Sequence, residues 1–136
     1  KEFVYNRASE YPSIHIRGRV TRAAMIKEML LSGIYAYPND YPETFCMSAL
    51  EAQAAGMVVV TTDQAALSTT VRNNTNFLIC DAPTEDTYKR AFMDAINKAV
   101  NNFQPLSVAN RLAILDAKTD WSDIATSWIN LVWGLV

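Results

Sequence analysis

The sequence is poor in the residue types that build metal centres and disulfide frameworks. It contains one histidine and two cysteines among 136 residues. Cys46 and Cys80 follow no metal-ligand spacing and cannot form a disulfide framework, so a reducing, cytosolic setting is expected. His15 lies in an alternating apolar stretch with no acidic or cysteine partner nearby, and we expect it to be structural rather than catalytic.

Basic runs and long apolar runs are also missing. Lys and Arg number 12 against 14 Asp and Glu, which leaves a formal net charge of −2. Without a basic stripe, nothing indicates binding to nucleic acid. No apolar run approaches the roughly 20 residues that cross a bilayer, and no signal peptide is visible. We therefore expect neither a nucleic-acid partner nor a transmembrane segment, and a location in the cytoplasm or at a membrane surface.

The chain does contain enough apolar residues for one domain. At 136 residues, with 50% hydrophobic and 19% charged residues, its composition is that of an ordinary globular domain. It begins at Lys1 without an initiating methionine and with an apolar pattern already under way. We expect residues 1–136 to be a single domain of a longer chain, truncated on its N-terminal side.

Short β-branched stretches alternate with helical patterns along the chain. The continuous run over residues 57–62 is typical of a strand buried on both faces. Helices are expected where apolar residues recur at helical spacing behind a capping residue such as Thr21 or Thr84. The expected strands are 13–17, 34–37, 57–62 and 77–80, and the expected helices are 1–8, 21–31, 48–55, 67–71, 84–101 and 106–136, the last with a break near 119–120.

This alternation predicts an α/β fold, an open doubly wound parallel sheet with additional helices at the C-terminus. Ligands of such sheets bind beyond the carboxyl ends of the strands. Four segments follow the expected strands and should therefore converge on one edge of the sheet: Gly18 and residues 39–43, 63–66 and 81–83.

Two carboxylates, Glu43 and Glu51, stand at this edge and in the helix behind it, with seven residues between them. Pro42 disfavours helix before it, which places Glu43 at the mouth of the helix. Gly56 is a natural helix stop and leaves Glu51 in the interior, among small and apolar residues that favour a cleft. Open N–H groups at a helix N-terminus bind negative charge, and carboxylates accept hydrogen bonds from hydroxyl groups. The pattern suggests a nucleotide-sugar site.

The block from about residue 13 to residue 62 resembles the C-terminal, donor-binding domain of retaining glycosyltransferases with the GT-B fold, specifically glycosyltransferase family four. The Glu-x7-Glu signature of that family falls on Glu43 and Glu51. Weaker similarity continues to the C-terminus, through a segment with tryptophans at 121 and 128. The residues that carry the resemblance are 14–20, 37–39, 42–46, 48–52 and Gly56 with the valine run behind it.

The resemblance implies a role for each site residue. Glu43 would be the catalytic residue, which bonds hydroxyls of the donor sugar and supports the positive charge that develops as the glycosidic bond breaks. Glu51 would hold the hydroxyls of the ribose. The remaining donor-binding contacts would come mainly from the backbone, and the residues implied are Gly18 at the base, Thr44, Phe45 and Cys46 at the sugar, and Ala49 and Leu50 at the phosphates.

The resemblance also implies the activity of the whole protein. It would transfer a hexose from a nucleoside diphosphate sugar to a glycan, lipid or protein acceptor, without a cofactor and without an obligatory metal. An acceptor-binding N-terminal domain and a pyrophosphate-binding arginine and lysine would lie upstream of Lys1. We therefore expect the chain alone to be inactive.

The sequence departs from the family pattern in the loop after the valine run. The family carries a glycine and then a glutamate four residues later, where this chain has Ala65 and Thr69. Gln53 stands where a hydrophobic residue is usual, and Val58 where proline is common. The changed loop favours an alternative of another class, a catalytically silent Rossmann-like module retained for binding or assembly.

Other conspicuous side chains have an ordinary structural interpretation. Cys46, near the helix N-terminus, has no histidine partner and is expected to be a small buried residue. The three tryptophans of the last helix are expected to pack it on the core or on a missing domain. Arg17, Arg19 and Arg22 could face a diphosphate, but solvated surface charge is the simpler expectation.

Overall fold

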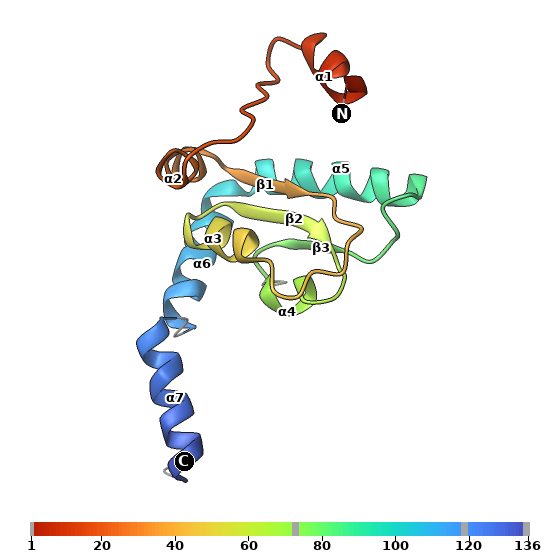
Figure 1. Ribbon diagram of the computed structural model, residues 1–136. Helices are drawn as coiled ribbons and strands as arrows, with labels where there is room; N and C mark the ends of the chain where they lie inside the picture. Colours follow the sequence, from red (N-terminus) through yellow and green to blue (C-terminus); the bar gives the residue numbers. More distant parts are fainter. Residues whose placement is uncertain (1, 72–73, 118–119, 135–136) are drawn as a thin grey trace.

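The centre of the fold is a three-stranded parallel sheet. The computed structural model describes residues 2–71, 74–117 and 120–134. Ile34 lies opposite Val58, and Val60 lies opposite Phe77. Three of the expected strands are confirmed, each to within one residue at its ends. In spatial order the strands are β1 (Ile34–Tyr37), β2 (Val58–Thr62) and β3 (Phe77–Ile79) (Figure 1).

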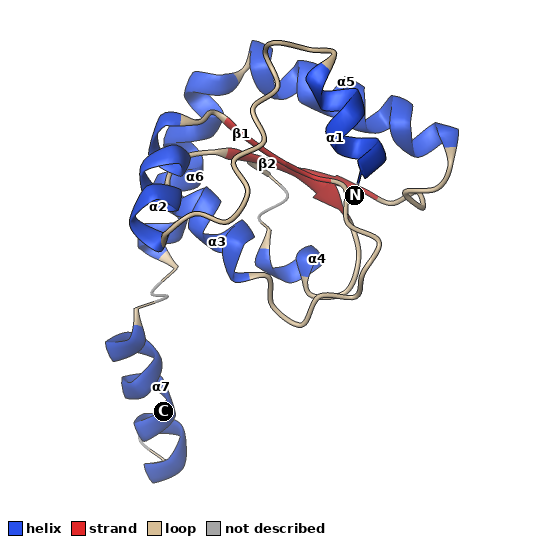
Figure 2. Cartoon of the chain, turned by 45° about the horizontal axis from the view of Figure 1, so that its top comes forward, coloured by secondary structure: helices blue, strands red, loops and turns tan. Residues whose placement is uncertain are grey.

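Helices cover both faces of this sheet, which confirms the predicted α/β, Rossmann-like class (Figure 2). As expected, Thr21 caps a helix, because its Oγ1 accepts a hydrogen bond from the N–H of Ala24 at 3.3 Å. Gly56 also ends a helix as expected, with a left-handed φ of 85°. The helices are α1 (Glu2–Ser9), α2 (Arg22–Leu31), α3 (Met47–Ala54), α4 (Leu67–Thr70), α5 (Asp86–Asn101), α6 (Phe103–Asp116) and α7 (Trp121–Trp133).

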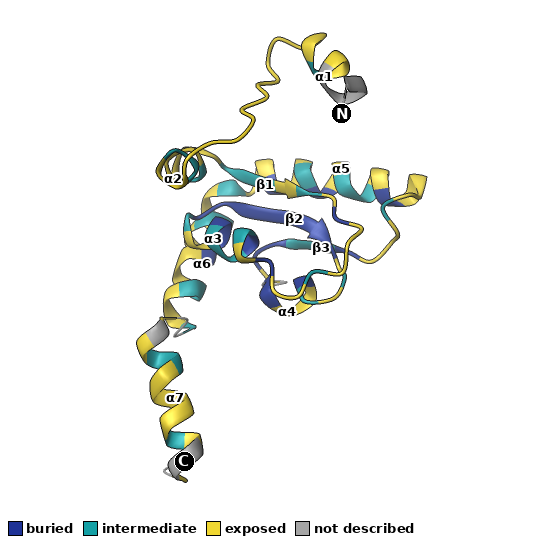
Figure 3. Cartoon of the chain, in the orientation of Figure 1, coloured by how far each residue is buried: buried dark blue, intermediate teal, exposed yellow. Residues whose placement is uncertain are grey.

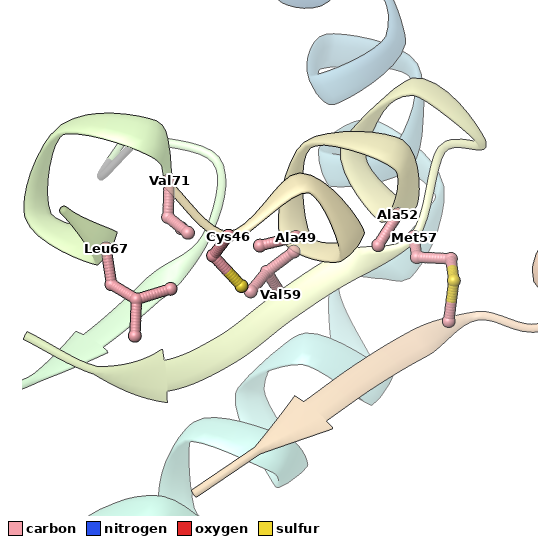
Figure 4. Packing of buried hydrophobic residues seen from close by; sticks show 7 residues of the cluster. All are labelled: Cys46, Ala49, Ala52, Met57, Val59, Leu67 and Val71. Carbon is pink, nitrogen blue, oxygen red and sulfur yellow. The ribbon is translucent and has the colours of Figure 1, made fainter. Parts of the chain in front are cut away.

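One face of the sheet packs against α3 and α4. Ala49 and Ala52 are the fully buried apolar residues of α3, and their small side chains let the helix lie close to β2. All five residues of β2 are buried, which confirms a strand covered on both faces (Figure 3). The buried apolar residues on this side are Cys46, Ala49, Ala52, Met57, Val59, Leu67 and Val71 (Figure 4).

The opposite face packs against α5. This helix is amphipathic, and its buried residues recur at helical spacing on the side that faces the sheet. The hydroxyl of Tyr88 lies 2.9 Å from Oγ1 of Thr62, so the helix is also tied by a hydrogen bond to the last residue of β2. The buried residues on this side are Val58, Val60, Ile79, Tyr88, Ala95 and Ala99.

The expected strand over residues 13–17 is wrong. These residues form no strand, and the segment runs from α1 to α2 away from the sheet (Figure 1). Ile14 and Ile16, whose alternation suggested the strand, are 51% and 45% exposed. A strand exists only through hydrogen bonds to a neighbour, and in the described part of the chain the sheet pairs only β1, β2 and β3. Gly18 therefore does not follow a strand end.

Two helix starts differ from expectation. The N-cap of α5 is Glu85, so the predicted cap Thr84 lies one residue too early. Helix α6 begins at Phe103, earlier than the expected residue 106. Pro105 fits there because a proline in the first turn of a helix removes no intrahelical hydrogen bond.

Helix α7 runs away from the sheet at the C-terminal end (Figure 1). Asp120 caps it by accepting a hydrogen bond from the N–H of Ser122 at 2.7 Å, and residue 119 of the expected break lies outside the described residues. Trp128 is 64% exposed, so it does not pack on the core; the other expectation, packing on a missing domain, stays a prediction. The side chains of Trp121 and Trp133 lie outside the described residues.

A buried polar network joins α3 and α6 to the sheet. Gln53, unusual for its position in the sequence, is buried and donates to the carbonyls of Ala49 and Thr70 at 3.1 and 3.0 Å. Asn76 accepts from the N–H of Val59 at 2.7 Å. This bond satisfies a strand N–H one residue before the β2–β3 pairing begins at Val60.

Asn110 of α6 completes this network. Its Nδ2 donates to the carbonyl of Met57 and to Oδ1 of Asn76, both at 2.9 Å. Its Oδ1 accepts from Nδ2 of Asn76 at 2.8 Å and from Oγ1 of Thr75 at 2.5 Å. The start of β2 and the start of β3 are therefore held by one fully buried side chain.

Ala65, in the loop after β2, adopts a left-handed backbone with φ of 49°. A left-handed backbone destabilises a residue that has a Cβ by about 1–2 kcal/mol. Glycine avoids this strain but loses more conformational entropy on folding, which costs about 0.5–1 kcal/mol. We expect Ala65→Gly to raise the free energy of unfolding by about 0.5–1 kcal/mol. Ala109, in the interior of α6, is the control with an ordinary helical backbone, and Ala109→Gly should lower it. Urea unfolding measures the free energy of unfolding of both variants. If the two substitutions change it in the same direction, Ala65 is not strained.

Candidate functional site

The loop from β1 to α3 places Glu43 at the carboxyl edge of the sheet. The hydroxyl of Tyr37, the last residue of β1, donates to Oε1 of Glu43 at 2.9 Å. The N–H of Ala66 donates to the carbonyl of Glu43 at 3.1 Å, and Oγ1 of Thr70 donates to the carbonyl of Phe45 at 2.6 Å. The turn that carries Glu43 is therefore fixed by β1 on one side and by the loop and helix after β2 on the other.

Tyr37 is a site residue that the sequence reasoning missed. Burial, the hydrogen bond to Glu43 and the charge of that carboxylate raise the pKa of Tyr37 to about 12. The phenol therefore stays protonated at neutral pH and remains a donor to Glu43. Tyr35 lies two residues earlier on the strand, and its hydroxyl oxygen is 2.9 Å from Oγ of Ser48 in α3. The period of two along β1 is the signal that could have found this pair.

The N-terminus of α3 follows four residues after Glu43. Cys46, the N-cap, has a left-handed φ of 59° and no side-chain capping bond. The N–H groups of Met47 and Ser48 have no acceptor within the described ranges of the chain. A helix N-terminus with open donors and no acidic residue in its first turn can bind an anion.

The two backbone N–H groups that the resemblance implies for the phosphates, at Ala49 and Leu50, are hydrogen-bonded within the chain. The N–H groups of Ala49 and Leu50 both donate to the carbonyl of Cys46, at 3.0 and 3.4 Å. These two groups are therefore occupied by the first turn of the helix. The backbone N–H groups that remain open lie two residues earlier, at Met47 and Ser48.

Glu51 lies in the interior of α3 and faces a groove between α2 and α3. Its side chain is 23% exposed, which agrees with the expected orientation into a cleft. Nη2 of Arg22 lies 2.6 Å from Oε1 of Glu51, so this arginine, whose side chain stays exposed as expected, also forms an ion pair. The groove has a volume of about 280 Å³ and is lined by Arg22, Ile26, Met29, Leu30, Glu51, Ala54 and Ala55.

The other predicted donor residues divide into two groups. Thr44 and Phe45 are exposed and Cys46 is buried in the turn between Glu43 and α3, so these three are together. Gly18 lies in the segment before α2, with a positive φ of 61°. Its neighbours Arg17 and Val20 border a second groove, of about 360 Å³, together with Tyr35 and Ser48.

Three of the four expected segments do converge at the carboxyl edge. Asp40, Asp63 and Asp81, one from each loop, line a depression of about 340 Å³. The thiol of Cys80 donates to Oδ2 of Asp63 at 3.5 Å, and this hydrogen bond and the nearby carboxylate charge raise the pKa of Cys80. A raised pKa makes this exposed cysteine a poor thiolate nucleophile.

The described residues offer neither a cluster of metal ligands nor a membrane-spanning helix. Within the described ranges, no three histidine, cysteine, aspartate or glutamate side chains gather closely enough to hold a metal ion. None of the helices in these ranges combines the length and apolar character that crossing a bilayer requires.

Comparison with known proteins identifies the family. Residues 7–107 match the family described as glycosyl transferases group 1, a match that covers more than half of the chain and includes both glutamates, α3 and the whole sheet. No protein with a curated description matches the chain. Both the α/β fold and this family match support a donor-binding domain of a glycosyltransferase. The chain belongs to the group 1 glycosyl transferases.

Proposed function

We propose that the chain is the donor-binding part of a retaining glycosyltransferase of family four. The full-length protein transfers a hexose from a nucleoside diphosphate sugar to a glycan, lipid or protein acceptor. The acceptor is bound by an N-terminal domain outside this chain, and neither a cofactor nor an obligatory metal takes part. One observation carries the proposal: Glu43 is held by Tyr37 at the carboxyl edge, immediately before a helix N-terminus with open N–H groups.

The chemistry divides between the carboxylate and the helix. The N–H groups of Met47 and Ser48 bind the diphosphate and stabilise its growing negative charge as it leaves. Glu43 accepts hydrogen bonds from sugar hydroxyls, and its fixed charge stabilises the oxocarbenium-like transition state. Neither role needs a covalent bond between Glu43 and the sugar.

The remaining donor residues bind the other parts of the nucleotide. Glu51, at the groove between α2 and α3, accepts hydrogen bonds from the ribose hydroxyls. The exposed turn at Thr44 and Phe45, with Cys46, offers backbone donors to the sugar. Gly18 and the groove beside it accept the base.

A second candidate is a catalytically silent module that serves binding or assembly. The observation that favours it is Ala65, because the strained left-handed alanine stands where the family has glycine. In this alternative the loop next to Glu43 no longer supports transfer.

Calorimetric titration of the full-length protein separates the two candidates. The proposed function predicts binding of at least one of ADP, GDP and UDP, with a dissociation constant in the micromolar to millimolar range. Glu51→Gln should weaken that binding. Absence of heat with all three nucleotides, in a protein shown to be folded, would contradict the donor-binding proposal and favour the silent module.

A further inference from the structure

The groove between α2 and α3 carries an ion pair. Arg22 is the first residue of α2, and the capping bond of Thr21 fixes the start of that helix. Its guanidinium meets Oε1 of Glu51 at 2.6 Å across the groove. The arginine side chain is 70% exposed, whereas the glutamate side chain is 23% exposed. The carboxylate is therefore held at the groove, and the arginine reaches it from the solvent side.

The ion pair with Arg22 leaves acceptor positions of the Glu51 carboxylate free for further hydrogen bonds. A carboxylate has about four acceptor positions on its two oxygens. Within the described residues, Arg22 is the side-chain partner of Glu51, and it contacts Oε1. Oε2 and the remaining positions of Oε1 stay available to hydroxyl donors. The ion pair is thus compatible with a ligand diol at the same carboxylate.

Orientation of Glu51 depends on this contact. The walls beside it are apolar side chains of α2 and α3, among them Ile26 and Met29, which offer no hydrogen bond to a carboxylate. A glutamate has three side-chain torsions, and fixing them costs entropy that a ligand would otherwise have to offset. A partner that fixes the carboxylate before the ligand arrives removes that cost.

We propose that Arg22 is a positioning residue for the donor: it holds Glu51 in the orientation that accepts the ribose hydroxyls. This inference rests on the proposed function, because Glu51 must be the ribose-binding residue. Arg22 acts through Glu51, so its removal should affect recognition of the ribose and not binding of the diphosphate.

The test compares ribose and 2′-deoxyribose nucleotides in the full-length protein. Dissociation constants are measured by calorimetry for ADP, GDP and UDP and for their 2′-deoxy forms, and the ratio of the two constants reports ribose recognition. We expect a ratio of about tenfold in the wild type. Arg22→Ala should reduce the ratio to about threefold or less, and Arg22→Lys should restore most of it.

Arg7→Ala is the matched control. Arg7 pairs with Glu10 at the same distance of 2.6 Å, but it lies in α1. This variant loses an arginine and an ion pair without touching the groove, and its ratio should equal that of the wild type. Circular dichroism of each variant confirms that the fold is retained.

Three results would overturn the proposal while leaving the proposed function intact. Equal weakening of both nucleotide forms by Arg22→Ala would indicate direct contact with the phosphates. Tighter binding of both forms would indicate that Arg22 competes with the ligand for Glu51. Dissociation constants equal to those of the wild type for both forms would show that Arg22 does not act on nucleotide binding. Absence of binding of all six nucleotides to the wild type would overturn the proposed function and this inference with it.

Discussion

Glu43→Gln in the full-length protein is expected to lower the rate of sugar transfer about 10²- to 10³-fold, with little change in donor affinity. Glutamine keeps the length of the side chain and can still accept the hydrogen bond from Tyr37, so the turn should remain in place. The variant loses the negative charge, which stabilises the sugar only when positive charge develops in the transition state. The rate is measured as the initial rate of sugar transfer at saturating nucleotide sugar. Hydrolysis of the nucleotide sugar in the absence of acceptor is an alternative assay.

Two further variants sharpen this result. Glu10→Gln removes an exposed carboxylate that pairs with Arg7 in the N-terminal region, and it should leave the rate unchanged. Tyr37→Phe keeps the charge of Glu43 but removes the hydroxyl that orients it, and its rate should fall between those of the wild type and Glu43→Gln. Wild-type rates for Glu43→Gln would show that the carboxylate does not act in the reaction.

Asn110→Ala is expected to lower the free energy of unfolding by about 2–4 kcal/mol. The substitution removes the donor to the Met57 carbonyl and the paired amide contacts with Asn76. These groups lie in the interior, where water cannot replace the lost hydrogen bonds without entering the core. Denaturant unfolding of the chain, followed by circular dichroism, measures the difference.

Gln104→Ala supplies the comparison within the same helix. Gln104 is exposed on α6, so its truncation should change the free energy of unfolding by no more than about 0.5 kcal/mol. A loss of less than about 1 kcal/mol for Asn110→Ala would show that the network is not a main support of the sheet.

Features that depend on local sequence could be predicted. The strands β1, β2 and β3 and the helices α2 and α3 were expected within a residue or two, because alternation, helical spacing and caps act over short distances. Glu43 and Glu51 were placed by the same local signals, Pro42 and Gly56. The missed strand at residues 13–17 shows the limit, since its pattern was right but pairing requires a neighbouring strand.

Features that depend on distant partners could not be predicted. Gln53 was recognised as unusual, but its burial depends on hydrogen bonds to Thr70 and Asn76, which lie 17 and 23 residues away in the sequence. Arg22 is exposed as expected, but its ion pair with Glu51, which lies 29 residues away in the sequence, was not predicted. No local pattern reports such contacts. The open N–H groups at Met47 and Ser48 likewise depend on where the helix actually begins.

The central claim is that the turn at Glu43 and the first turn of α3 bind the donor. Hydrogen exchange of the full-length protein, measured by mass spectrometry with and without a bound nucleoside diphosphate, tests it most directly. The account predicts slower exchange in peptides that cover residues 43–51, which contain the open N–H groups of Met47 and Ser48, and no change in α5. Binding that leaves exchange over residues 43–51 unchanged would contradict the account.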